Sequence, residues 1–239
     1  MSTKNELKKQ NKQAADTNDF VSSSEAFLIK NQKKIIIALV ALVILIAGFF
    51  LAKNLLQNRE DKAQTLLTQG LTYVQQGDYD KALNGDNVFP GFVKIANGYS
   101  FTDASNIAKL WAGICYAKKA DFKQAIKFLE DFSPKSDHMI SPAGLATLAN
   151  CYAEIGEIDK AVKTFEKAAK LADNDATSPE YLLQAGVLLQ SQNKQAEAAK
   201  LYEKIKSDYP GSSYNFGNVT ADSIIEDGLI EAYIESTKE

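Results

Sequence analysis

The sequence has few of the residues from which enzymes build active sites. Its 239 residues include one His and two Cys. His138 lies in the polar segment SPKSDHMISP, with no second metal ligand at a recognisable spacing. The chain also lacks a phosphate-binding glycine loop and the GxSxG and HExxH motifs. We therefore expect no enzyme activity and no site for a cofactor or a metal.

Proline and glycine are also scarce, with five and thirteen residues. Because these residues interrupt helices, their scarcity predicts a mostly helical chain. The stretch from Leu51 to Gln69 contains neither of them. We expect a helix to run through it, from an apolar N-terminal segment into the first helix of a folded domain.

The charges are unevenly distributed, although the net charge is only −3. Residues 1–56 contain eight Lys and four Asp or Glu, whereas the remainder contains 19 basic and 26 acidic residues. An acidic body argues against binding to nucleic acid. A basic N-terminal segment joined to an acidic domain fits a chain that crosses a membrane.

One long apolar run supports that interpretation. Residues 35–52 carry no charge over 18 positions, close to the roughly 20 residues that cross a bilayer. The alternatives are a buried core helix and a cleaved signal peptide. However, no polar stripe interrupts the run, and it begins late in the chain without a small-residue cleavage motif. We predict an uncleaved signal-anchor helix over 34–56, held in the lipid bilayer through residues 35–56.

The flanking charges predict the orientation of this helix. Seven Lys residues precede the apolar run, and three basic residues follow it closely. Basic flanks stay in the cytoplasm, so residues 57–239 are expected in the periplasm of a bacterium, anchored by a single span in the inner membrane. Residues 1–33 are polar and basic, and we expect a largely disordered cytoplasmic tail there.

A repeated pattern occupies the rest of the chain. A small residue is followed, at fixed spacings, by a large residue, a turn residue, an Ala and a second large residue. The Ala of the pattern recurs at Ala82, Ala125, Ala161 and Ala198. This is the pattern of the tetratricopeptide repeat, a pair of helices in about 34 residues. The predicted repeats lie near residues 63–85, 106–133, 142–173 and 179–210, with a capping helix over 220–236.

The pattern predicts an all-α protein: a single N-terminal transmembrane helix, then a tetratricopeptide-repeat solenoid of about four repeats with a C-terminal capping helix. Small residues such as Gly113 and Gly186 let the paired helices approach closely, and large residues fill the gaps. Cys115 and Cys151 occupy equivalent small-residue positions. We expect both in the core, too far apart for a disulfide.

The step between the first two repeats is lengthened by an insertion over residues 86–105. The segment is too apolar to remain free in solvent, so part of it should form a short helix that packs on the solenoid. Long loops in compact domains are often functional. The alternative is therefore a docking loop for a partner, with Phe89, Phe92, Tyr99 and Phe101 as its contacts.

The repeat register also predicts a groove, lined by the first helix of each repeat. Only Asn150 fits the Lys, Arg and Asn pattern that binds a carboxylate tail in some proteins of this fold. The remaining positions are apolar, so a partner or another part of the chain should cover them. The predicted groove residues are Leu67, Leu71, Val74, Ile107, Leu110, Ile114, Ala117, Ala143, Ala146, Asn150, Leu183 and Val187.

A family resemblance joins these features. The segments GFVKIANGYSFTDASNIAKLWAGICYAKKADFKQAIKFLEDF (91–132) and SPEYLLQAGVLLQSQNKQAEAAKLYEKIKSDYPGS (178–212) resemble the YfgM-like proteins of Bacteroidetes-type bacteria. The resemblance covers roughly residues 25–212 and does not extend to the C-terminal helix, which departs from the family's basic ending. It implies an ancillary subunit of the SecYEG translocon that acts with a PpiD-like membrane-anchored chaperone on translocating secretory proteins.

Two functions follow as hypotheses. In the first, the chain is a translocon-associated protein-binding scaffold that contacts a chaperone and client proteins. In the second, it is a structural adaptor in another cell-envelope assembly, such as a secretion or motility complex. The complex that co-purifies with the chain in mild detergent distinguishes the two hypotheses.

Overall fold

The computed structural model of the chain describes residues 3–216, 219–220, 223–224 and 228–238. The chain divides into two compact units, Met1–Gln57 and Asn58–Glu239. The first unit consists of the N-terminal part of helix α1 (Thr3–Gln75), and the second contains the remaining elements.

Helix α1 contains the apolar run, and its side chains there have no protein cover. Leu45 is 70 % exposed, and Phe49 is 66 % exposed. Among the described residues, this is the one helix long and apolar enough to span a membrane. A core helix would be covered by the rest of the protein, so the structure argues against that alternative.

The backbone is helical from Thr3 to Gln75 without a break, as the absence of Gly and Pro between Leu51 and Gln69 predicts. The helix also includes residues 3–33, where the sequence predicts a largely disordered tail. This stretch contains no Gly or Pro, and its Lys, Gln, Glu and Ala residues favour a helix locally.

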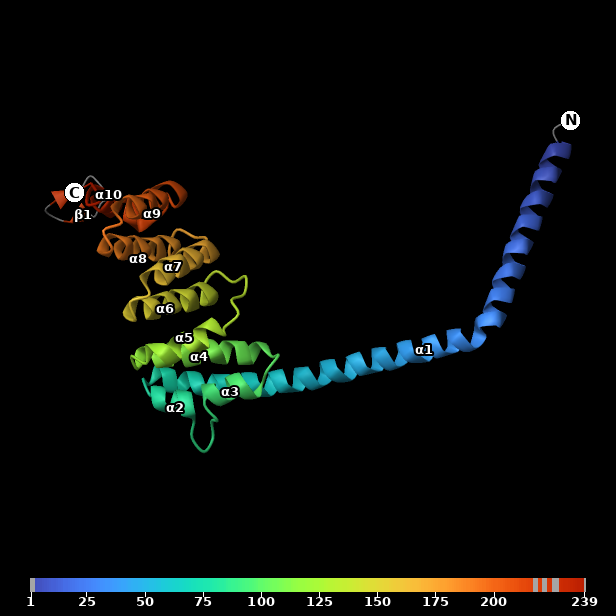
Figure 1. The fold of residues 1–239 in the computed structure, drawn as a ribbon, viewed down its shortest axis with the longest axis horizontal. Helices are drawn as coiled ribbons and strands as arrows, with labels where there is room; N and C mark the ends of the chain where they lie inside the picture. The colour runs from blue at the N-terminus through green and yellow to red at the C-terminus, as the bar shows by residue number, and fades with distance from the viewer. Residues whose placement is uncertain (1–2, 217–218, 221–222, 225–227, 239) are drawn as a thin grey trace. The chain divides into compact units, whose positions relative to one another are not determined.

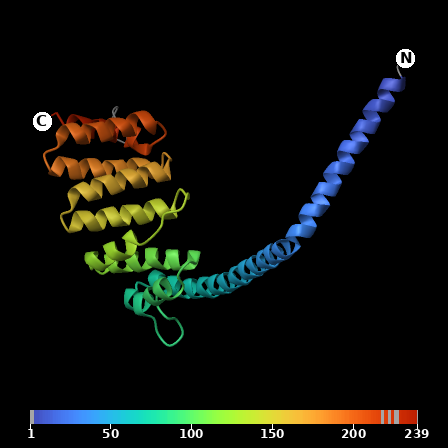
Figure 2. The same ribbon diagram turned by 45° about the vertical axis from the view of Figure 1, so that its right-hand side comes forward.

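The second unit is a stack of four helix pairs, which confirms the predicted all-α repeat fold (Figures 1 and 2). In the first pair, residues 58–75 of α1 are followed by α2 (Tyr79–Asn84). The later pairs are α4 (Asp103–Lys118) with α5 (Phe122–Glu130), α6 (Ile140–Glu154) with α7 (Ile158–Ala172), and α8 (Ser178–Ser191) with α9 (Gln195–Asp208).

A tight turn with one left-handed residue joins the helices of each pair. Gly77 and Gly156 take φ values of 74° and 82°, as expected for glycines that end a helix. Ala120 and Asn193 occupy the same place in the other pairs, with φ values of 58° and 59°. The turn geometry is therefore imposed by helix packing even where the residue is not glycine.

Within a pair, a small residue meets a large one sixteen positions later. A Cβ atom added to Gly113 would overlap Leu129, and one added to Gly186 would overlap Tyr202. Close approach of the two helices therefore requires glycine at these positions. Ala149 and Phe165 have the same spacing and lie in the same core.

The first pair has no large residue at this spacing, and aromatic residues of the insertion take its place. Asp86 lies sixteen residues after Gly70, and α2 has only six residues. The aromatic rings against Gly70 belong instead to Phe89 and Phe92, 2.6 and 2.5 Å from a Cβ built there. Phe92 begins a short helix, α3 (Phe92–Gly98), which packs against α4. This confirms the predicted short helix within the insertion.

The C-terminal region differs from the predicted capping helix over 220–236. Strands β1 (Val219–Thr220) and β2 (Ser223–Ile224) pair antiparallel, after a short 3₁₀ turn (Ser213–Asn215). The helix α10 spans only Leu229–Glu235. Ile224, within the predicted helix, is β-branched, and such residues favour strands. Ile225, also part of that prediction, lies outside the described residues.

Helix α10 nevertheless covers the last repeat. Ile230 is 1 % exposed within the core that also contains Tyr202. The rings of Tyr202 and Tyr233 lie 5.3 Å apart. A shorter helix therefore performs the capping role that an open solenoid end requires.

Candidate protein-binding surface

Three of the predicted groove residues lie together. Asn150 on α6 and Leu183 and Val187 on α8 line one pocket of about 460 Å³. Val187 is 44 % exposed, and Leu183 is half-buried. The pocket also contains Ala153, Phe165, Gln184 and Leu188, which were not predicted as groove residues.

The lining of this pocket is mostly apolar, with two amide side chains. Phe165 borders the pocket but is only 1 % exposed, and the aliphatic side chains of α8 supply most of the apolar lining. The amides of Asn150 and Gln184 supply the polar groups. Apolar surface with a few hydrogen-bonding groups suits an apolar side chain of a partner together with its backbone.

Helical spacing could have identified most of the missed residues. Ala153 lies three positions after Asn150, and Gln184 and Leu188 each follow a predicted residue directly. Phe165 belongs to the repeat pattern as a core anchor. Nothing in the repeat pattern indicates that its ring also borders a pocket, because that depends on how far α8 stands from α7.

In its first half the predicted groove is covered by the chain itself, one of the two alternatives that the sequence leaves open. Leu110 is 2 % exposed and contacts the position where Gly144 leaves no Cβ. Leu67 is 8 % exposed and lies in the core of the first repeat. Both are packed because Gly144 and the insertion allow neighbouring elements to approach more closely than the repeat register implies.

The other predicted positions divide between the core and the surface. Ala146 is buried, and Asn150 and Ala143 are exposed. The half-buried residues pack against the cores of the first two repeats, and they are Leu71, Val74, Ile107, Ile114 and Ala117.

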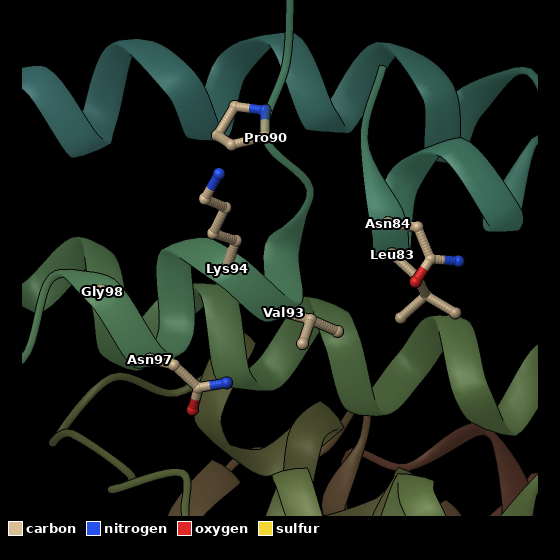
Figure 3. Close-up of a pocket in the computed structure, with 7 residues that line it drawn as sticks. All are labelled: Leu83, Asn84, Pro90, Val93, Lys94, Asn97 and Gly98. Carbon is tan, nitrogen blue, oxygen red and sulfur yellow. The ribbon is translucent and has the colours of Figure 1, made fainter. Parts of the chain in front are cut away.

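The insertion forms a second pocket of about 460 Å³, shown in Figure 3. Val93, Lys94, Asn97 and Gly98 line it from α3, and Pro90 precedes them. Leu83 and Asn84 come from the end of α2. This pocket is more polar than the one on α8, and of the predicted docking aromatics none lines it.

The four aromatic residues of the insertion differ in how far they are buried. Phe89 and Phe92 are 1 % and 0 % exposed, which confirms that the insertion packs on the solenoid and argues against the docking alternative for these two residues. They fill the core of the first repeat because Gly70 leaves space for them. Tyr99 is half-buried, with the guanidinium of Arg59 over its ring. Phe101 alone is open to solvent, at 95 % exposure.

Asp86 holds the insertion in place. Its carboxylate accepts hydrogen bonds from the Tyr73 hydroxyl and from the backbone N–H groups of Val88 and Phe89. These bonds favour the charged form and lower the pKa of Asp86 to about 2. At neutral pH a charged acceptor therefore helps to order the loop, in addition to the burial of Phe89.

The residues capable of chemistry have structural roles. Cys115 and Cys151 are free thiols at 0 % and 1 % exposure, and burial raises their pKa values to about 12 and about 11. The His138 ring contacts the carbonyls of Leu171 and Ala172 at the end of α7. Within the described residues, no three His, Cys, Asp or Glu side chains are grouped to hold a metal.

The match to a known family covers most of the chain. A tetratricopeptide repeat-like domain model matches residues 25–224. The chain belongs to the tetratricopeptide repeat-like domain family. Repeat folds of this family are typically protein-binding scaffolds without catalytic activity. None of the curated proteins matches the chain significantly.

Two solved structures support the same fold. Both are tetratricopeptide-like repeats of a kinesin light chain described as that of Podosopora anserina, and the second is a single-residue variant of the first. The first has a TM-score of 0.53 at 12 % identity and covers 74 % of this chain and 86 % of its own. The variant has a TM-score of 0.52 at 11 % identity, covering 74 % and 85 %. Identities this low establish the fold alone.

Proposed function

We propose that this tetratricopeptide repeat-like protein is a membrane-anchored scaffold of the bacterial inner membrane that works as an ancillary subunit of the SecYEG translocon. Residues 57–239 face the periplasm, where they bind a PpiD-like membrane-anchored chaperone and pass translocating secretory proteins onward. The N-terminus stays in the cytoplasm.

The observation that carries this proposal is the extent of the family match. The matched region begins at residue 25, so it includes the apolar part of α1 as well as the repeats. An anchor and a repeat domain that belong to one family unit suit a scaffold that works beside a membrane complex. The unevenly distributed charges support the proposed orientation.

The pocket on α6 and α8 is the proposed partner-binding site. Its exposed aliphatic residue, Val187, would be covered by an apolar side chain of the chaperone or of a client. Asn150 and Gln184 would then meet the partner's backbone.

A pull-down in mild detergent tests the proposal. Tagged full-length protein is solubilised from bacterial membranes, and the co-purified proteins are identified by mass spectrometry. Recovery of SecYEG with a PpiD-like chaperone supports the translocon role. Recovery of another envelope complex without the channel favours the structural adaptor instead, and recovery of neither overturns both.

Protease accessibility tests the orientation separately. Protease added outside spheroplasts should digest the repeats and leave a tag at the N-terminus protected. Digestion of the N-terminal tag with protected repeats would contradict the proposed topology. Because this result does not depend on the partner, it distinguishes a wrong orientation from a wrong complex.

A further inference from the structure

The turn between α3 and α4 exposes an aromatic side chain at a conformational cost. Phe101 is 95 % exposed and has a φ of 68°, a region that residues other than Gly, Asn and Asp rarely occupy. Neither packing within the chain nor local preference accounts for a phenylalanine here. We therefore expect the Phe101 side chain to contact something outside this chain.

Two residues that follow the apolar run hold this turn. The Arg59 guanidinium donates a hydrogen bond of 2.7 Å to the Gly98 carbonyl and lies 5.9 Å from the centre of the Tyr99 ring. The Glu60 carboxylate accepts a hydrogen bond from the Ala104 N–H at 3.1 Å, at the start of α4. All of these contacts lie within the second unit.

Chain connectivity then brings the turn close to any bilayer that contains the apolar run. Arg59 follows Leu56, the last residue of the predicted span, by three positions. Three residues reach at most about 11 Å even when fully extended. The polar interface outside the hydrocarbon core is itself roughly 5–7 Å thick on each side. Arg59 therefore lies within about 11 Å of the end of the predicted span, and the turn that its side chain contacts is close to it in the chain's fold.

We propose that the α3–α4 turn is a second membrane contact, in which Phe101 inserts into the interfacial region of the bilayer that holds residues 35–56. The inference rests on the proposed membrane anchor. Tyrosine and arginine suit membrane interfaces, where an apolar body meets polar headgroups, and phenylalanine buries at the boundary between headgroups and acyl chains in membrane-surface segments. Tyr99 and Phe101 of the turn, with Arg59 of α1 beside Tyr99, supply this combination.

The turn between α5 and α6 lies on the same edge of the repeat stack as the α3–α4 turn (Figure 1). Lys135 forms an ion pair of 3.0 Å with Asp103, and the Asn106 amide donates to the Ser133 carbonyl at 2.8 Å. Shortly after them, Met139 is 80 % exposed and Ile140 is 55 % exposed. This edge therefore carries two more exposed apolar residues, separated from Phe101 by the polar side chains of Asp103, Asn106 and Lys135.

Val88 offers a matched control within the same insertion. It is 74 % exposed, but its loop is tied through Asp86 to Tyr73. Tyr73 follows Arg59 by fourteen residues of α1, about 21 Å along a helix. An apolar residue of similar exposure thus lies well away from the point where the chain leaves the bilayer.

Fluorescence quenching in vesicles tests the proposal. Full-length Phe101→Cys, Val88→Cys and Leu45→Cys are labelled with bimane and reconstituted in phosphatidylethanolamine and phosphatidylglycerol vesicles. The two native thiols are buried and should not label in the folded protein. Nitroxides attached to lipid near the headgroup, or deep in the acyl chain, then report the depth of each site.

The expected result is several-fold stronger shallow quenching at position 101 than at position 88, with deep quenching at position 45. Equal quenching at 101 and 88, with position 45 still deep, overturns the interfacial contact and leaves the anchor intact. Loss of deep quenching at position 45 overturns the anchor itself. The two failures are therefore distinguishable in one experiment.

Discussion

Replacing Phe92 with Ala tests whether the insertion is part of the core. The ring is 0 % exposed, lies 5.5 Å from the Phe89 ring and 6.5 Å from the ring of Trp111, and fills the space beside Gly70. Removing a fully buried phenylalanine typically costs about 3–5 kcal/mol. The free energy of unfolding of a whole domain is about 5–15 kcal/mol. The loss should therefore be a large fraction of the stability of the first repeat.

Urea unfolding of the full-length protein in detergent measures this loss. Trp111 is the single tryptophan and stacks on the Phe92 ring, so its fluorescence reports the first two repeats. Circular dichroism reports the whole helical domain. Because repeats interact mainly with their neighbours, the fluorescence transition should move to lower urea ahead of the dichroism transition.

Phe101→Asn is the matched variant from the same insertion. Asn accepts a positive φ, and the side chain it replaces is 95 % exposed, so the free energy of unfolding should change by less than about 0.5 kcal/mol. A core role for the insertion is refuted if Phe92→Ala costs under about 1 kcal/mol, or if the two variants lose similar stability.

Three other predictions follow from the structure. Val187→Asp should weaken partner recovery by at least about tenfold with the fold intact, whereas Leu110→Asp should unfold the domain by circular dichroism because its side chain is buried. Asp86→Asn should lower the urea midpoint at neutral pH. The difference from the wild type should disappear as the pH falls from about 4 to 2, because a carboxyl group with a lowered pKa stabilises the fold only while it is charged. Cys115 and Cys151 should react with a maleimide only after unfolding, as followed by mass spectrometry, because burial raises their pKa values.

The Val187 prediction has a control of nearly equal exposure. Ile155 is 42 % exposed in the turn after α6 and does not line the pocket. Ile155→Asp should leave partner recovery unchanged. If both variants lose the partner equally, the pocket on α6 and α8 is not the binding site.

The repeat fold could be predicted because its signal is periodic. In each repeat the Ala follows the small residue by twelve positions, and the structure buries the Ala residues and places Gly113 and Gly186 at close contacts between helices. The groove could be predicted only in part. Asn150, Leu183 and Val187 share a pocket, but Leu110 is covered because Gly144 brings α6 closer. The exposure of a groove residue depends on how closely the neighbouring repeat packs against it. The pattern within a single repeat does not give that distance.

The burial of the insertion's aromatic residues has a signal in the sequence that the repeat spacing alone does not reveal. In the later repeats the residue sixteen positions after the small residue is Leu129, Phe165 or Tyr202, and in the first repeat it is Asp86. A charged residue at that position means that the second helix cannot fill the core as the others do. The next large residues, Phe89 and Phe92, lie three and six positions later and are both buried. The insertion therefore supplies the aromatic side chains that the second helix of the first repeat lacks. Asp86 is not needed in the core, and its carboxylate instead accepts hydrogen bonds from the loop that leads to them.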